Sequence, residues 1–72
     1  MTVLDLNQVR SEAEAIVYGR LMEEPLSVED ITSLLSENKI PFSRRVAKEI
    51  AWKMAEEGKA RFNDKWLLEL QN

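Results

Sequence analysis

The sequence contains no cysteine and no histidine among its 72 residues. These absences exclude disulfide bonds, thiolate or imidazole metal ligands, and catalysis by a histidine acid or base. No uncharged stretch approaches the ~20 apolar residues that a membrane-crossing helix needs. The N-terminus shows no basic region followed by an apolar one, as a secretory signal would. We therefore expect a cytoplasmic protein with no membrane partner, metal or cofactor.

Glycine and proline are scarce, with two residues of each. Pro25, Pro41 and Gly58 lie where periodic apolar patterns end, whereas Gly19 lies inside one. The chain is 44% apolar and 32% charged, as in ordinary globular proteins. Its length suits one domain near the lower size limit for a hydrophobic core. We expect a single domain over residues 1–72.

The first periodic segment predicts a helix over about residues 6–24. Asp5 is a suitable N-cap, and Pro25 stops the helix. Helical spacing is seen in the apolar residues Val9, Ala13, Ile16, Val17 and Leu21.

A second, shorter helix is predicted over about residues 28–37. Ser27 is its expected N-cap, and Asp30 occupies the third helical position, where it can complete a capping box. Asn38 is the expected left-handed residue at the C-terminal end.

The third predicted helix covers about residues 44–57, with Ser43 as N-cap and Gly58 just after its end. Its apolar stripe consists of Val46, Ala47, Ile50, Ala51 and Met54. The opposite face carries Arg45, Lys48, Glu49, Trp52 and Glu56. Trp52 points away from the middle of the apolar stripe, so we do not expect it in the core.

After the third helix the apolar period changes from 3.6 to 2, which predicts a β-hairpin over about residues 59–70. A three-residue loop, 63–65, would pair Phe62 with Trp66 and place the apolar residues on one face. A two-residue loop would set Phe62 opposite Lys65 and split the apolar residues between the faces. Because the buried face sets the register, we favour the longer loop and place Trp66 in the core.

This order of elements resembles the winged helix-turn-helix superfamily. The resemblance is carried by Pro25–Ile31, Ser43–Val46, Gly58–Phe62 and Trp66–Leu68, and extends over nearly the whole chain. It implies a mainly α fold with three helices and a small antiparallel β-hairpin, the C-terminal wing. It also implies a third strand at Pro25 and Leu26. In addition it implies a third helix that enters the major groove of DNA and a wing that contacts the DNA backbone.

The resemblance implies a small transcriptional regulator that binds double-stranded DNA, as a dimer. Arginine has a planar donor fork that suits guanine edges and phosphates, which independently favours such a role for the basic start of the third helix. The expected DNA-binding residues are Ser43, Arg44, Arg45, Lys48, Trp52, Arg61 and Lys65.

The distribution of charge leaves a second hypothesis open. The net charge is −3, which combines −6 in residues 1–37 with +3 in residues 38–72. This asymmetry indicates a basic working face on an acidic body, or simply two solvated surfaces. Glu49 and Glu56 share the solvent face of the third helix and would repel phosphates. The alternative is a protein-docking winged helix that uses Trp52 and the acidic first helix, and RNA is a third possible ligand.

An enzyme is not expected. Two pairs of adjacent acids, Glu23–Glu24 and Glu56–Glu57, could be mistaken for catalytic carboxylates. Both stand at predicted helix ends, where carboxylates are usually solvated, and the sequence places no base or nucleophile beside them. We assign no catalytic residue.

Overall fold

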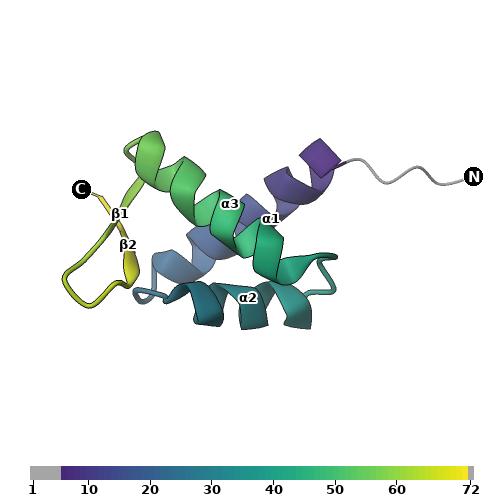
Figure 1. Cartoon of the computed structure of the whole chain (residues 1–72), viewed down its shortest axis with the longest axis horizontal. Coiled ribbons are helices and arrows are strands. Elements are labelled where there is room, and N and C mark those ends of the chain that lie inside the picture. Colours follow the sequence, from purple (N-terminus) through teal and green to yellow (C-terminus); the bar gives the residue numbers. More distant parts are fainter. Residues whose placement is uncertain (1–5, 72) are drawn as a thin grey trace, which may run out of the picture.

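A computed structural model describes residues 6–71 and contains three helices followed by a hairpin (Figure 1). The elements are α1 (Leu6–Leu21), α2 (Val28–Glu37), α3 (Ser43–Glu56), β1 (Ala60–Phe62) and β2 (Leu68–Leu70). The two strands form an antiparallel sheet. The expected mainly helical fold with a small antiparallel hairpin after the third helix is confirmed. Asp5, the expected cap of the first helix, lies outside the described residues.

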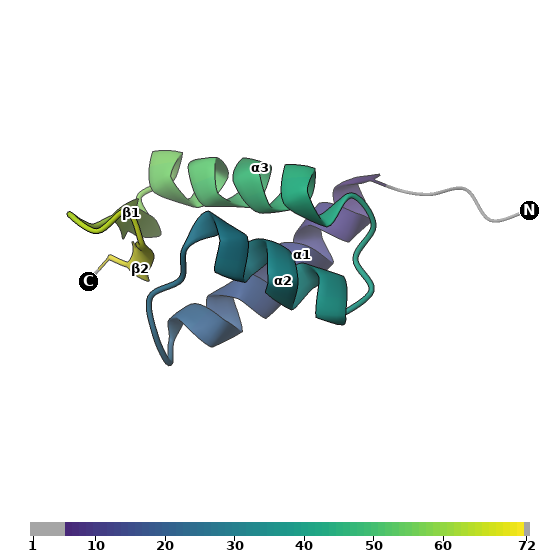
Figure 2. The ribbon, with the colours of Figure 1, turned by 60° about the horizontal axis from the view of Figure 1, so that its bottom comes forward.

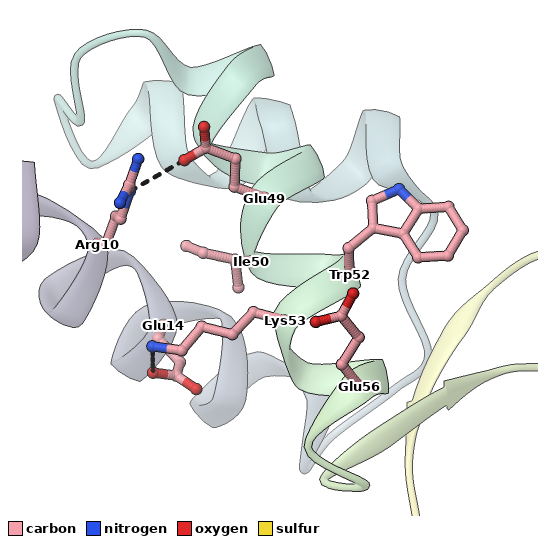
Figure 3. A pocket seen from close by; sticks show the side chains of 7 residues that line it. All are labelled: Arg10, Glu14, Glu49, Ile50, Trp52, Lys53 and Glu56. Atoms are coloured by element: carbon pink, nitrogen blue, oxygen red, sulfur yellow. Dashed lines mark ion pairs between the residues drawn. The ribbon is translucent and has the colours of Figure 1, made fainter.

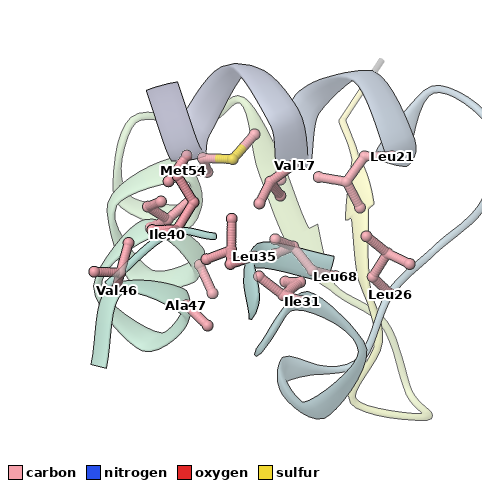
Figure 4. Close-up of a cluster of buried hydrophobic side chains, with 14 residues drawn as sticks. Val17, Leu21, Leu26, Ile31, Leu35, Ile40, Val46, Ala47, Met54 and Leu68 are labelled. Atoms are coloured by element: carbon pink, nitrogen blue, oxygen red, sulfur yellow. The ribbon is translucent and has the colours of Figure 1, made fainter. Parts of the chain in front are cut away.

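The core lies between the three helices and the inner side of the hairpin (Figure 4). Each fully buried large side chain contributes about 1.5–3 kcal/mol through removal from water. The largest are Ile31, Leu35, Ile50, Met54, Leu68 and Val17. Ile50 and Met54 anchor α3 by one side, which fixes which residues of this helix face outward.

The start of α2 confirms the predicted capping box. The Ser27 hydroxyl accepts a hydrogen bond from the Asp30 backbone N–H at 3.0 Å, and the Asp30 carboxylate accepts one from the Ser27 N–H at 3.2 Å. At the other end the prediction was wrong, because Asn38 has φ −91° and the left-handed residue is Lys39, with φ 60°. The Asn38 side chain instead donates to the Leu34 carbonyl at 2.8 Å, and the helix ends at Glu37, as predicted.

The first helix is shorter than predicted and ends at Leu21 rather than at residue 24. A tight turn follows, in which the Glu23 N–H donates to the Arg20 carbonyl at 2.9 Å. The chain then extends, because residues before a proline avoid the helical region and because Leu26 pairs with Leu68. Two hydrogen bonds, of 2.9 and 2.7 Å, join the backbones of Leu26 and Leu68. The strand implied at Pro25–Leu26 is therefore present as one isolated bridge.

The third helix begins one residue earlier than predicted and is not capped by Ser43. Phe42 is its N-cap, in the left-handed conformation with φ 54° and without a side-chain cap, and Ser43 is the first helical residue. The Phe42 carbonyl accepts the first helical hydrogen bond, from the Val46 N–H at 2.9 Å. At the other end Gly58 has φ 76°, a conformation that favours glycine, as predicted.

The hairpin has a longer loop than predicted. Phe62 pairs with Leu68, not with Trp66, so residues 63–67 form the loop. The two registers differ by two residues and therefore bury the same face of the hairpin. In the observed register Leu68 pairs with Phe62 and also forms the bridge with Leu26, a contact that the pattern of the hairpin alone does not show. As a result Trp66, expected in the core, lies in the loop and is 75% exposed.

Candidate nucleic-acid interface

The outer side of α3 is free of other backbone elements within residues 6–71 (Figure 2). Arg44, Lys48 and Trp52 follow one another at intervals of four residues and therefore form one line along this helix. All three side chains are exposed, and Trp52 is 62% exposed. The prediction that Trp52 lies outside the core is confirmed. We call these three residues the outer stripe.

The two cations of the outer stripe have no counter-ion among residues 6–71. Neither Arg44 nor Lys48 forms an ion pair with any residue of the described chain, 6–71. The same holds for Lys65, which is exposed in the hairpin loop. Within residues 6–71, three positive charges thus remain uncompensated on α3 and in the hairpin loop, where an anionic ligand could reach them.

Arg45 lies on the edge of α3 nearer to α1 and is partly compensated. The Glu49 carboxylate forms two ion pairs, with Nε of Arg10 on α1 at 3.0 Å and with Nε of Arg45 at 3.6 Å. The Arg45 side chain nevertheless remains 82% exposed. Glu49, which we expected to weaken a basic face, is therefore shared between two arginines.

Glu14 of α1 organises a second group of charges on the same edge. Its carboxylate lies 3.8 Å from the Lys53 ammonium and 3.3 Å from that of Lys59. The Lys59 ammonium also lies 3.4 Å from the Glu57 carboxylate. The hydrogen bond to Glu14, and then the negative charges of Glu14 and Glu57, raise the pKa of Lys59 above 10.5. These lysines connect α1, α3 and the start of the hairpin. We call this group of ion-paired residues on α1 and α3 the paired edge; it consists of Arg10, Glu14, Arg45, Glu49 and Lys53.

A surface depression of about 330 Å³ lies between α1 and α3 (Figure 3). Trp52 and Glu56 stand on its α3 side, and Arg10 and Glu14 on its α1 side. Unlike Glu49, Glu56 forms no ion pair with the described residues. Its uncompensated negative charge reduces the positive potential beside Trp52.

The hairpin brings the remaining predicted residues to the C-terminal end of α3. Arg61 on β1 faces Glu69 on β2 across the register, and their charged groups lie 3.9 Å apart. Lys65 is exposed in the loop that follows. Ser43 lies at the opposite end of α3 and is half-buried. The structure therefore gathers Arg44, Lys48 and Trp52 on one line, and places the other predicted residues at its edges and ends.

Three aromatic side chains form a row that leads from α3 to the hairpin loop. The ring centroids of Trp52 and Phe62 are 5.8 Å apart, and those of Phe62 and Trp66 are 6.3 Å apart. Both contacts are tilted, with interplanar angles of 59° and 51°. We call these three residues the aromatic row. Phe62 packs against the core, as expected for a residue on the inner face of the hairpin. Trp66 was wrongly placed in the core because the predicted loop has three residues, whereas the observed loop has five and contains Trp66.

Within residues 6–71, no group of three or more histidine, cysteine, aspartate or glutamate residues could hold a metal ion. None of the helices there has both the length and the apolar character needed to cross a membrane. In the comparison with known proteins, no family model, no curated protein and no solved structure matches this chain.

Proposed function

We propose that this chain is a winged helix-turn-helix domain that binds duplex DNA and acts in transcriptional control. In this proposal the outer side of α3 enters the major groove, and the hairpin contacts the sugar-phosphate backbone. The observation that carries the proposal is the outer stripe, where Arg44 and Lys48 have no counter-ion in the described part of the chain. Cations compensated within the protein contribute little to phosphate binding, whereas free ones release counter-ions from the DNA.

The acidic net charge is compatible with this function because many carboxylates lie elsewhere or are paired. Residues 1–37 carry a net charge of −6, and this part of the chain forms α1 and α2 rather than the proposed contact face. On α3, Glu49 is shared between Arg10 and Arg45. Glu56 is the carboxylate of α3 that opposes phosphate binding without such compensation.

The predicted residues have distinct parts in this proposal. Arg44 and Lys48 contact phosphates or base edges, and Arg45, whose side chain is 82% exposed, reaches the same groove from the edge of α3. Lys65 contacts the backbone from the wing. Arg61 is held by Glu69 and contributes less. Because a single small domain buries a modest interface on DNA, we propose that two copies bind a palindromic site.

Fluorescence anisotropy with labelled mixed-sequence duplexes of about 25 base pairs tests this function. Lys48→Ala should weaken binding and make the dependence of log K on log salt shallower by about one unit, as for a lost phosphate contact. Lys53→Ala is the matched control, since it removes the same charge from the same helix at a position paired with Glu14. Equal effects of the two substitutions, or no binding by the unmodified protein, would reject the proposal.

Protein docking is the second candidate function, and the exposure of Trp52 favours it. Trp52 adjoins the depression between α1 and α3, so one partner could contact both helices (Figure 3). Exposed tryptophans are frequent energetic centres of protein interfaces. Under this hypothesis Trp52→Ala abolishes self-association or partner binding in sedimentation experiments, while duplex affinity does not depend on Lys48.

A further inference from the structure

The aromatic row presents two large aromatic side chains to solvent. Trp52 and Trp66 are 62% and 75% exposed, and Phe62 lies half-buried between them. These are the two tryptophans of the chain, and both belong to the row. Exposed apolar area that is contiguous rather than scattered marks a binding surface.

The hairpin loop holds Trp66 outward in a conformation that large side chains rarely adopt. Its φ is 62°, in the left-handed region. Asn63 stabilises this loop, since its side-chain oxygen accepts hydrogen bonds from the N–H groups of Lys65 at 2.9 Å and Leu67 at 3.0 Å. The Asn63 carbonyl also accepts a bond from the Trp66 N–H at 3.0 Å. The exposed indole is therefore placed by a defined loop.

A lysine stands at each end of the row. Lys48 precedes Trp52 by one helical turn, and Lys65 directly precedes Trp66. Neither lysine has an ion-pair partner within the described part of the chain. Glu56, one turn after Trp52, and Asp64, two residues before Trp66, likewise form no ion pair within residues 6–71, so each end of the row carries one lysine and one carboxylate. Aromatic faces bordered by free cations suit a ligand that combines flat rings with negative charge.

We propose that the aromatic row stacks on unpaired bases, so that the favoured ligand is DNA with a short single-stranded segment beside a duplex. Base–aromatic stacking tolerates any sequence because every base has a π face, and the flanking lysines neutralise the phosphates of the same strand. In intact duplex DNA the bases are stacked on each other and their faces are covered. The duplex part of this ligand rests on the proposed function of α3, whereas the single-stranded part rests on the row alone.

The two row tryptophans provide a direct signal for this proposal. Three probes are titrated: a blunt duplex, the same duplex with a five-nucleotide thymidine overhang, and a single-stranded oligothymidine of about 15 nucleotides. Stacking should quench tryptophan fluorescence with the overhang duplex and the oligothymidine. The overhang duplex should also bind at least about fivefold more tightly than the blunt duplex, the lower end of the contribution of one stacked base.

Substitutions assign the effect to the row. Trp66→Ala should remove the preference for the overhang, and Trp66→Phe should retain part of it, because phenylalanine still stacks. Tyr18→Ala is the matched control, since Tyr18 is an exposed aromatic residue of α1, 45% exposed, outside the row. Thermal unfolding should show that Trp66→Ala leaves the fold intact, as expected for a residue of such high exposure.

The possible results separate this proposal from the one on which it builds. Tight binding of the blunt duplex that depends on Lys48, without overhang preference or quenching, overturns base stacking and leaves duplex binding in place. Quenching by the oligothymidine without blunt-duplex binding supports base stacking and rejects the major-groove function. Loss of self-association in Trp66→Ala, with DNA binding unchanged, shows that a second copy covers the row and overturns the proposal.

Discussion

The outer stripe of α3 and the side of α3 that belongs to the paired edge both carry charged residues, but these residues differ in what they contact. On the paired edge, Glu49 and Lys53 form ion pairs with Arg10 and Glu14 of α1. On the outer stripe, Arg44 and Lys48 have no partner in the described chain. The number of charges on a helix therefore does not show which charges are available to a ligand, because some of them are compensated within the fold. The difference also explains how a chain with a net charge of −3 can present a cationic strip.

The largest effect should follow from removing the unpaired cations together. The triple substitution of Arg44, Lys48 and Lys65 by alanine should lower duplex affinity by roughly two to three orders of magnitude at about 0.1 M salt, since three phosphate contacts are lost. Replacing Arg10, Lys53 and Lys59, which are all ion-paired, provides the charge-matched control, with unfolding monitored in parallel. If the folded control loses as much affinity, net charge alone governs binding and the contrast between the two edges has no functional meaning.

A comparison of Met54 with Trp52 tests the contrast between the inner and outer sides of α3. Met54 is fully buried, so Met54→Ala should lower the free energy of unfolding by about 2–5 kcal/mol. Trp52 is 62% exposed, and Trp52→Ala should cost less than about 1 kcal/mol despite its larger side chain. Urea unfolding measures both. A larger loss for Trp52 would mean that its contact with Phe62 supports the fold, and that the aromatic row is part of the core rather than a binding surface.

Local sequence rules predicted the ends of helices correctly where the residues that end the helix are neighbours in the sequence. The bounds of α2, Val28–Glu37, agree with prediction because Ser27 and Asp30 form a capping box between neighbouring residues. Gly58 ends α3 by the same kind of local rule. The outward position of Trp52 followed from helical periodicity alone.

The predictions were wrong where the local structure involves contacts between segments that are distant in the sequence. The loop of the hairpin has five residues rather than three, and in the observed register Leu68 pairs with both Phe62 and the distant Leu26. In the same way α1 ends before residue 24, ahead of the chain that leads to Leu26, and Trp66 lies on the surface rather than in the core. The division of α3 into two edges could not be predicted either, since no local pattern shows that Arg10 and Glu14 would reach Glu49 and Lys53.

Glu14 should make a modest contribution to stability through the paired edge. Its side chain is 20% exposed and lies near the ammonium groups of both Lys53 and Lys59. Glu14→Gln removes both attractions, and we expect a loss of about 0.5–1 kcal/mol that shrinks as salt is added. Urea unfolding at low and high salt provides the measurement. DNA affinity should not fall in this variant, and a decrease would show that the paired edge takes part in binding.

The smallest expected effect concerns Glu56, the uncompensated carboxylate near Trp52. Glu56→Gln removes a negative charge from α3 without breaking an ion pair within the described residues. Duplex affinity should therefore rise, by about two- to threefold, because a carboxylate close to phosphates costs a few tenths of a kcal/mol or more in water. Glu24→Gln is the control, since Glu24 is exposed after α1 in a depression lined by α2 residues. It makes the same charge change away from the proposed contact face, and should leave affinity nearly unchanged. Equal gains would indicate a long-range effect of net charge, whereas no gain for Glu56→Gln would mean that the DNA does not approach this part of α3.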